Sequence, residues 1–249
     1  MSAKQIIVTT SWDDGDLRDL RLADLLAARG MKGTFYCPVE PFSSDPALSK
    51  ADMRAMVAGG FEIGGHGVAH EIMSELPANK IDGIVTGCKA YLEDVLGQRI
   101  TSFCYPRGRF TASAVEAVRR AGYQGARTVR LLATDSHPDL FRMPTSVQVY
   151  PHTRVEYLRN IARAGSVQRL LDYSFGLKLE QDWIAIGKQL FERVLADGGI
   201  WHLWGHSWEI DALGLWGPLA EMLDYVAGRD QVLYLTNGEL GYLLANRSN

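Results

Sequence analysis

Hydrophobic positions in the first half of the chain follow two alternating periods. Short β-branched or aromatic runs predict buried strands at IIVTT (6–10), GTFYC (33–37) and RITSFCYP (99–106). Between them, apolar residues recur at helical spacing, as from Ile81 to Val95. Strand and helix therefore alternate with short connections, which predicts a parallel sheet with helices packed outside it.

The second half is less regular but keeps the same elements. The pattern at residues 154–197 predicts mostly helix. GIWHLW (199–204) predicts a strand, which a helix near 218–227 and a further strand at VLYLT (232–236) follow. LFRMPTSVQVY (140–150) favours an extended segment. About eight strands are enough to close a (β/α) barrel, although an open doubly wound sheet fits the same alternation. No repeat or linker divides the chain, so we predict one domain over residues 1–249.

Composition narrows the classes of function. The 26 Lys and Arg residues against 29 Asp and Glu give a net charge of −3, which leaves no basic excess for nucleic acid. The 47% of hydrophobic residues exclude a disordered chain, and no apolar run approaches the ~20 residues that span a bilayer. The N-terminus has no signal-peptide pattern, and three cysteines without a CxxC motif indicate neither a disulfide framework nor a cysteine-based zinc site. We expect a cytoplasmic protein.

Two histidines four residues apart, His66 and His70, could chelate one metal ion. If the segment forms one helical turn, both imidazoles reach a single ion, and the two preceding glycines let the backbone turn sharply. The alternative is a pair of ordinary surface histidines. A second HxxxH, His202 to His206, lies in a predicted strand, where four residues cover about 13 Å and no metal can be shared. We expect His202 in the core and His206 at the strand end.

Adjacent carboxylates, Asp13 and Asp14, follow the first predicted strand. Carboxylates repel one another, so this pair favours a bound cation, with one carboxylate as ligand and its neighbour facing a water. The alternative is an Asp-Gly turn that caps the next helix. Trp12 flanks Asp13 and four tryptophans gather around His206, and aromatic faces suit sugar rings. We expect Trp12, Trp208 and Trp216 to contact a substrate, with Trp201 or Trp204 in the core.

Four segments in this order resemble the motifs of the polysaccharide deacetylases, also called the NodB-homology or carbohydrate esterase 4 family. TSWDDGD (10–16) is similar to the opening motif of that family, and HGVAH (66–70) to its two-histidine motif. FCYPRG (103–108) resembles the third motif and LWGH (203–206) the last. The resemblance covers residues 6–130 well, 199–245 moderately, and 135–197 weakly.

The resemblance implies a distorted (β/α) barrel of the NodB type and a role for each motif residue. Asp14, His66 and His70 would bind one divalent metal, most often zinc in this family. Asp13 would be the general base, and His206 the general acid. The peptide N–H of Arg107 would hold the oxyanion of the reaction.

The chain departs from the family pattern in two places. Gly67 replaces the usual Ser or Thr, and Phe103 occupies the position of the third-motif arginine. Arg107 therefore either orients Asp13 or faces the substrate. Asp135 is a candidate for an aspartate of a further motif. Glu209, near His206, could orient that imidazole or bind a substrate amine, and Tyr105 and Arg109 could line the pocket.

We therefore predict a metal-dependent carbohydrate N-deacetylase. The expected substrate is an amino-sugar saccharide or its nucleotide- or lipid-linked precursor in the biosynthesis of surface polysaccharide such as lipopolysaccharide. Two alternatives stay open, an amidohydrolase of a non-sugar amide and a silent saccharide-binding protein that keeps the metal site. No membrane insertion is expected. The oligomeric state is open, since the 154–197 helices could form a dimer surface or a lid.

Overall fold

Strand β1 (Ile6–Asp13) is the centre of an eight-stranded sheet in the computed structural model, which describes residues 4–246. All strand pairs are parallel, as predicted. The remaining strands are β2 (Thr34–Cys37), β3 (Glu62–Gly65), β4 (Ser102–Cys104), β5 (Gly125–Arg127), β6 (Val147–Gln148), β7 (Gly199–Gly205) and β8 (Val232–Leu235). The α-helices are α1 (Asp19–Ala27), α2 (Lys50–Ala58), α3 (Ala78–Leu96), α4 (Ala112–Arg120), α5 (Arg154–Ala164), α6 (Val167–Leu171), α7 (Trp183–Asp197), α8 (Ser207–Ala212), α9 (Trp216–Val226) and α10 (Asn237–Ala245). Short 3₁₀ or π turns are η1 (Met73–Glu75), η2 (Pro106–Gly108), η3 (Leu140–Arg142) and η4 (Asp172–Gly176).

The sheet curls into a distorted (β/α) barrel, which confirms the predicted fold. The strand order is β5-β4-β3-β2-β1-β7-β6. One edge of β1 pairs β7 at Ile6–Trp12, while the other pairs β8 at Ile6–Thr9 and β2 at Ser11–Asp13. A parallel bridge between Arg127 and Met143 links β5 to the segment that leads into β6. The extended segment that we expected at 140–150 is therefore mostly irregular, with β6 its only strand.

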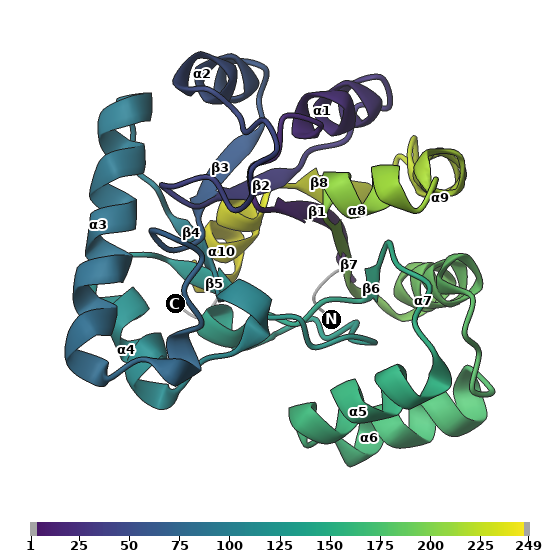
Figure 1. Cartoon of the computed structure of the whole chain (residues 1–249). Helices are drawn as coiled ribbons and strands as arrows, with labels where there is room; N and C mark the ends of the chain where they lie inside the picture. The colour runs from purple at the N-terminus through teal and green to yellow at the C-terminus, as the bar shows by residue number, and fades with distance from the viewer. Residues whose placement is uncertain (1–3, 247–249) are drawn as a thin grey trace.

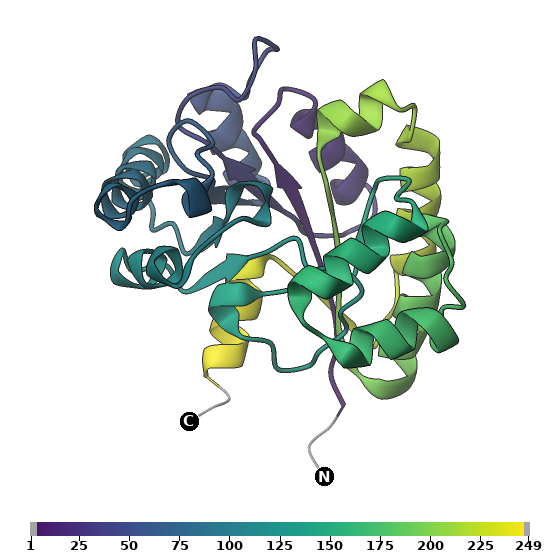
Figure 2. The ribbon, with the colours of Figure 1, turned by 60° about the horizontal axis from the view of Figure 1, so that its bottom comes forward.

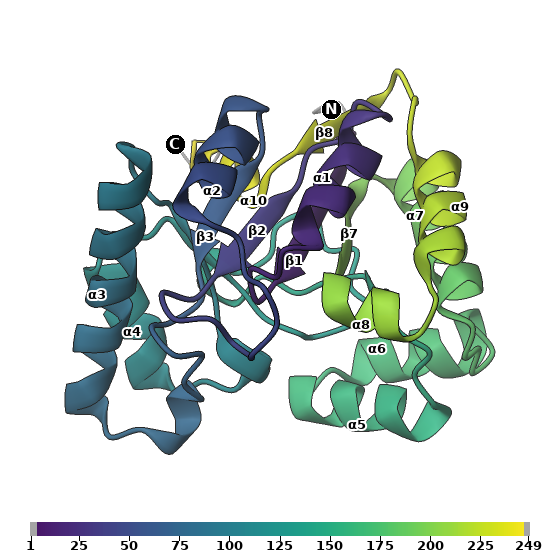
Figure 3. The same ribbon diagram turned by 45° about the horizontal axis from the view of Figure 1, so that its top comes forward.

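Helices pack outside the sheet except between β5 and β6, which an irregular segment with η3 connects (Figure 1). Helices α1 and α2 lie across the barrel from the pair α5 and α6, and α3 and α4 pack side by side (Figures 1 and 3). The ends of the described chain lie at the same end of the barrel (Figure 2). No helix in residues 4–246 is long and apolar enough to cross a membrane.

Side-chain caps set where several helices begin. Ser49 and Asp52 form a reciprocal capping box at α2, and Thr153 and Glu156 form another at α5. Thr111 accepts a hydrogen bond from Ala114 N at the start of α4. These capping residues fix where the helices begin and therefore how long the loops are that connect the strand ends to the helices. The candidate site lies at these strand ends.

Alternation along β1 separates two environments. Ile6, Val8 and Trp12 face the main hydrophobic core under the helices. The intervening side chains face the barrel interior, where Thr9 Oγ1 donates to Asn237 Oδ1 (2.6 Å) and Ser11 Oγ contacts His202 Nε2 (2.8 Å). Asp13 is the next residue on this interior face. The strand period therefore points the Asp13 carboxylate into the barrel.

Candidate functional site

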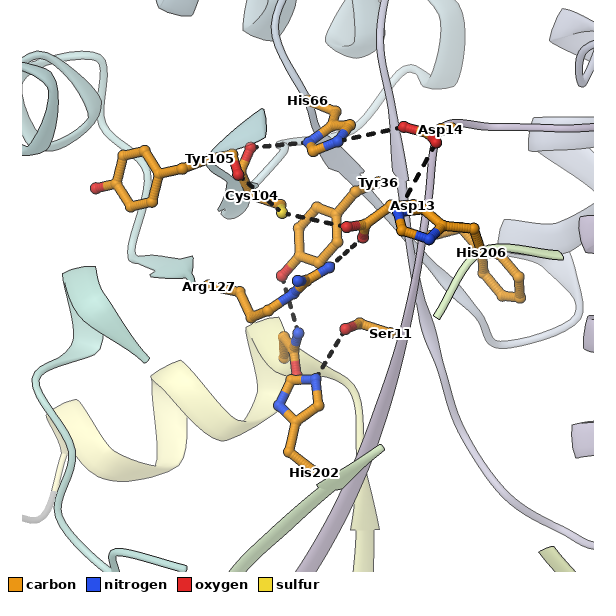
Figure 4. A network of polar contacts seen from close by, with 12 residues as sticks. Ser11, Asp13, Asp14, Tyr36, His66, Cys104, Tyr105, Arg127, His202 and His206 are labelled. Atoms are coloured by element: carbon orange, nitrogen blue, oxygen red, sulfur yellow. Dashed lines mark hydrogen bonds and ion pairs between the residues drawn. The ribbon is translucent and has the colours of Figure 1, made fainter. Parts of the chain in front are cut away.

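The candidate site lies at the carboxyl end of the strands. Asp13 ends β1 and Asp14 follows it, His66 follows β3, Arg127 ends β5 and His206 follows β7. Figure 4 shows these side chains converging from separate strands. Parallel barrels gather side chains from several strands at this end, so residues far apart in sequence meet there.

Asp14 holds the centre of the cluster. Its backbone is left-handed at φ 82°, followed by Gly15 at φ 64°. This turn reverses the chain after β1 and directs the Asp14 carboxylate toward the histidines rather than into the barrel. Asp14 Oδ1 lies 3.5 Å from His66 Nε2 and 3.5 Å from His70 Nε2. The other oxygen, Oδ2, accepts a hydrogen bond from Trp208 Nε1 at 2.9 Å.

The two histidines meet through a loop, not through the helical turn that we expected. Residues 66–70 are irregular, with Gly67 at φ 86° and His70 at φ 55°, and the imidazole centroids are 4.9 Å apart. Gly67 suits this left-handed conformation better than the Ser or Thr of the family motif. Glu71 Oε2 accepts a hydrogen bond from Val68 N at 3.0 Å and so holds the loop without that hydroxyl.

Gly64 and Gly65, before His66, are required because there is no room for a side chain, not because the backbone needs a conformation that only glycine adopts. Both lie in β3 without positive φ. A Cβ at Gly64 would lie 2.5 Å from the Tyr36 ring, and one at Gly65 would lie 2.5 Å from Tyr123 Oη. Our expectation of a sharp turn was therefore wrong, because close packing requires glycine here, inside the barrel at Gly64 and against the core under the helices at Gly65.

The donor atoms of Asp14, His66 and His70 fit a divalent metal. All three lie within 4.8 Å of one another, and Asp14 Oδ1 is buried without a hydrogen-bond partner within the described chain. His66 Nδ1 lies 2.9 Å from the Cys104 carbonyl oxygen, so Nδ1 carries a proton, and Nε2 faces Asp14 as the nitrogen that would bind a metal after losing its own proton. Burial and the nearby His66 lower the pKa of His70 to about 4, which keeps His70 neutral and able to bind a metal near pH 7. Two imidazoles and a carboxylate form a donor set that zinc accepts.

Electrostatics of the cluster keep Asp14 ionised. Burial opposes the charge, but the nearby His66 and His206 imidazoles and the hydrogen bond from Trp208 outweigh it, so the pKa of Asp14 falls below its usual range. An ionised carboxylate beside two imidazoles is the form that binds a cation.

Asp13 is paired with an arginine that the sequence analysis missed. Arg127 Nη2 donates to Asp13 Oδ1, and both side chains are buried. The Arg127 guanidinium lies 4.6 Å from the Trp204 ring centroid and 5.4 Å from that of Tyr36. Arg127 pairs in register with Cys104 on the neighbouring strand, and Cys104 Sγ lies 3.6 Å from Asp13 Oδ2. The alternative that Arg107 orients Asp13 is therefore wrong.

No signal in the sequence near the third motif pointed to Arg127. No strand was predicted at residues 125–127, so the only hint was the charged residue of GAR (125–127), which follows the third motif along the chain. A buried arginine requires an acidic partner, so its presence in a strand could have suggested a pair with Asp13. The arginine side chain reaches the same aspartate from β5, because β4 and β5 are neighbours in the barrel.

His206 faces Asp14 from the opposite side of the cluster. His206 Nε2 lies 3.9 Å from Asp14 Oδ2, and Nδ1 contacts Glu209 Oε2 at 3.2 Å. Burial opposes protonation of His206, but Glu209 and the two aspartates outweigh it and raise the pKa of His206. Gln148 Nε2 donates to Glu209 Oε2 at 3.2 Å, which holds the glutamate in place. Of the two roles expected for Glu209, the geometry favours orienting the imidazole.

A cavity of about 500 Å³ opens over these groups, a size suited to a small ligand. Trp208 forms part of its wall, stacked on Phe42 with a centroid separation of 6.3 Å. His152 also lines the cavity, and its Nε2 lies 2.9 Å from Gln148 Oε1. The lining residues are Asp13, Asp14, Phe42, His66, His70, Arg107, Val129, Leu131, Gln148, His152, Glu156, Arg159, Asn160, Arg163, Trp204, His206, Trp208 and Glu209.

Three residues expected to contact substrate lie elsewhere. Trp12 and Tyr105 are fully buried in the core, because Trp12 points to the helix side of β1 and the Tyr105 hydroxyl donates to the Phe141 carbonyl at 3.0 Å. Trp216 opens α9, donates to Asp211 and lies under Arg21 outside the cavity. These three expectations were wrong.

Two weaker candidates are surface residues. Arg109 pairs with Glu75 (3.1 Å) and Asp135 pairs with Arg169 (3.2 Å). Neither lines the cavity. His202 is buried against Ser11, which agrees with the expected core histidine.

A carboxylate and two imidazoles at the carboxyl end of a parallel barrel, with a second carboxylate and a third imidazole beside them, form a candidate hydrolytic centre. Residues 2–126, half of the chain, match the family model described as polysaccharide deacetylase. The chain belongs to the polysaccharide deacetylase family. A search of curated proteins finds no match.

Solved structures share the fold. A putative polysaccharide deacetylase from Mycobacterium smegmatis aligns over 100% of this chain and 93% of its own, with 16% identity and a TM-score of 0.72. A family 4 acetyl xylan esterase from Clostridium thermocellum, solved with a cobalt ion, aligns over 95% and 91% with 17% identity and a TM-score of 0.56. A CE4 family pseudoenzyme from Bacillus anthracis aligns over 92% and 63% with 14% identity and a TM-score of 0.52.

Proposed function

We propose that this protein is a metal-dependent N-deacetylase that hydrolyses the acetamide of an amino sugar. The observation that carries the proposal is the convergence of Asp14, His66 and His70 on one point, with Asp13 and His206 beside it in one cavity. Membership of the polysaccharide deacetylase family supports a carbohydrate substrate.

Asp14 and the two histidines would hold the ion, which we propose to be zinc. When bound, a divalent ion polarises an amide carbonyl and lowers the pKa of a coordinated water from about 15.7 toward about 7. The chain supplies three ligands and an open cavity above them, which leaves room for water and substrate.

Asp13 is proposed as the general base. Its carboxylate lies at the floor of the cavity, and its Oδ1 is occupied by Arg127. Oδ2 contacts only the weak thiol donor of Cys104 within the described chain, so this oxygen can accept a proton from the attacking water. Arg127 positions Asp13, since it holds one carboxylate oxygen and does not itself line the cavity.

His206 is proposed as the general acid. An amine leaves an amide readily only after protonation, so a second group must deliver a proton to nitrogen. His206 lies across Asp14 from the histidine ligands, and Glu209 fixes its ring through Nδ1, which leaves Nε2 facing the cavity. The carboxylate and the imidazole therefore approach the reacting amide from two sides.

The remaining contacts would bind the sugar and the oxyanion. The Arg107 peptide N–H is proposed to donate to the developing oxyanion, where loss of one donor typically costs ~10²- to 10³-fold in rate. The stacked pair of Trp208 and Phe42 offers an aromatic wall that suits the apolar face of a sugar ring.

Acetate release tests the proposal. Purified protein loaded with Zn²⁺ is incubated with N-acetylated oligosaccharides, and acetate and the mass loss of each sugar are measured. We expect turnover in the wild type and at least a 10²-fold lower rate in Asp13→Asn and in His206→Ala. The matched control is His202→Gln, which changes a buried histidine outside the cavity and should keep activity.

The other outcomes identify the alternative functions. Turnover of simple amides without turnover of sugars would indicate an amidohydrolase of a non-sugar amide. Sugar and metal binding without turnover of any amide would indicate a silent binding protein. Either result would contradict the proposed deacetylase.

A further inference from the structure

The three arginines that line the cavity are unpaired, unlike most other arginines of residues 4–246. Within residues 4–246, the side chains of four arginines make no hydrogen bond, ion pair or contact over an aromatic ring. They are Arg99, Arg107, Arg159 and Arg163. The other arginines of the described residues are engaged; Arg154, for example, donates to the Leu179 carbonyl at 2.9 Å. Three of the four free guanidiniums line the same cavity.

The acidic residues of this cavity already have partners. Asp13 accepts from Arg127, and Asp14 accepts from Trp208 and faces the histidines. Glu209 binds His206, and Glu156 closes the capping box of α5 through Thr153 N at 2.7 Å. The cavity carboxylates therefore have partners, whereas the guanidiniums of Arg107, Arg159 and Arg163 have none among residues 4–246.

Helix α5 holds two of these arginines in place. Arg159 and Arg163 are four residues apart, so they share one face of the helix, and both line the cavity. Asn160, between them, donates to the Val129 carbonyl at 2.7 Å and accepts from Leu131 N at 2.8 Å. These two bonds anchor α5 to the loop that forms the next part of the cavity wall. Arg107 faces the cavity from η2, on the side of His70.

We propose that the substrate carries a phosphate group, bound by Arg159, Arg163 and Arg107, while its acetamide lies over Asp14. The inference rests on the proposed deacetylase function and names its substrate class as a phosphorylated or diphosphate-linked N-acetyl sugar. A neutral oligosaccharide has no group that needs three guanidiniums. Guanidinium binds phosphate with paired, charge-assisted hydrogen bonds.

The number of cations favours phosphate over carboxylate. One carboxylate carries a single negative charge and is satisfied by one guanidinium, whereas a phosphate monoester or a diphosphate carries about two charges and more acceptor oxygens. Three arginines around one cavity therefore match phosphate more closely. Such a substrate would come from a reaction class that transfers sugar phosphates onto a nucleotide or a lipid.

Kinetics with paired substrates test the proposal. The Zn²⁺-loaded wild type, the Arg159→Gln/Arg163→Gln double variant and Arg99→Gln are compared on four N-acetyl sugars. These are N-acetylglucosamine, its 1-phosphate, its uridine diphosphate conjugate, and the same sugar linked through diphosphate to a polyprenol in detergent. Arg99→Gln is the matched control, because Arg99 is also free but does not line the cavity. Elemental analysis confirms equal metal content in all three proteins.

We expect the wild type to prefer phosphorylated sugars, and the double variant to raise KM for them about 10- to 100-fold with kcat within about twofold. KM for the neutral sugar should not change, and Arg99→Gln should behave as wild type. The effect should shrink with added salt, because these side chains are exposed. Preference for the nucleotide or for the polyprenol conjugate distinguishes the two sources of the phosphate.

Two results would overturn the proposal. One is a wild type with equal kcat/KM for phosphorylated and neutral sugars. The other is a double variant in which the ratio of these two kcat/KM values is the same as in the wild type. Turnover of the neutral sugar in that case leaves the deacetylase standing. If no sugar is turned over, the proposed deacetylase function is wrong. The affinity of the three proteins for pyrophosphate, measured by calorimetry, then tests the arginine site by itself. Pyrophosphate binding that is at least tenfold weaker in the double variant than in the wild type, but unchanged in Arg99→Gln, supports the arginine site. Equal pyrophosphate binding by all three proteins contradicts it.

Discussion

At the scale of single residues, the pair of Asp13 and Arg127 sets the chemistry of the site. Both side chains are buried, and the guanidinium lies between the rings of Tyr36 and Trp204. A buried charge without its partner is strongly destabilising. The family resemblance placed an arginine at the third motif, where this chain has Phe103, and the structure supplies the guanidinium from the neighbouring strand instead.

Arg127→Met should therefore lower both stability and activity. Loss of the guanidinium leaves Asp13 buried and alone, which should cost about 3 to 5 kcal/mol in the free energy of unfolding. Denaturant titration measures this loss. The double variant Asp13→Asn/Arg127→Met should recover much of the stability but none of the acetate release. A single variant as stable as wild type would contradict the pair as a structural unit.

His202 predicts a dependence of stability on pH that is separate from the active site. Burial, followed by the charge of Arg127, holds the pKa of His202 well below its usual value. The unfolded chain takes up a proton on this imidazole below about pH 6.5, but the folded chain does not, so folding loses stability as the pH falls.

Comparison with His202→Gln isolates this effect. Between pH 7.5 and pH 5.5 the wild type should lose about 1.4 kcal/mol more of its unfolding free energy than the variant. Urea titrations at both pH values measure the difference. An equal loss in the two proteins would show that His202 is protonated in the folded state.

At the scale of elements, β1 positions the two aspartates of the cavity, and α5 positions two of its free arginines. The two-residue period of β1 sends Trp12 to the helix core and Asp13 into the barrel, and the left-handed Asp14 then turns toward the histidines. Alternation of strands and helices, with motif residues at strand ends, was readable from the sequence because both depend on local periodicity. Trp12 was misplaced because neighbours in sequence were taken as neighbours in space.

Contacts between distant elements could not be read in the same way. Arg127 reaches Asp13 only because β5 lies beside β4, and α5 reaches the cavity only because Asn160 binds residues 129 and 131. The α5 region matched the family weakly, so neither periodicity nor motif indicated that Arg159 and Arg163 face the site. The loop geometry of residues 66–70 likewise depends on packing rather than on helical spacing.

Asn160→Ala should loosen α5 without changing the metal ligands. Two hydrogen bonds to backbone groups would be lost, which should lower the free energy of unfolding by about 1 to 3 kcal/mol. Hydrogen exchange should show faster exchange in α5 than in β1, with metal content unchanged. Gln168→Ala, at an exposed position of α6, is the control and should change neither quantity. Unaltered exchange in α5 would contradict the anchoring role of Asn160.

At the scale of the whole molecule, the barrel brings three regions of the chain to one cavity. The amino-terminal half supplies Asp14, His66 and His70, the carboxyl-terminal part supplies His206 and Trp208, and α5 between them supplies the free arginines. Closure of the barrel through the segment before β6 places α5 over the same strand ends as the metal ligands. The proposed chemistry and the proposed phosphate contact therefore depend on one arrangement of the fold.

Metal binding should also stabilise the folded chain. An ion that binds the native state alone raises stability by about 2.7 kcal/mol at a hundredfold excess over its dissociation constant. Thermal unfolding with Zn²⁺ and with a chelator measures the shift. Wild type and His202→Gln should both melt at a higher temperature with Zn²⁺, whereas His66→Ala should not respond. An equal response of all three proteins would place the ion elsewhere.

The most direct measurement is the metal content of purified protein after incubation with a small molar excess of Zn²⁺ and dialysis to remove unbound metal. We expect one metal ion per chain in the wild type and in His202→Gln, and less than about a tenth of that in His66→Ala and in Asp14→Asn, with all four proteins folded by circular dichroism. A stoichiometric ion that persists in both ligand variants would contradict a metal centre formed by Asp14, His66 and His70.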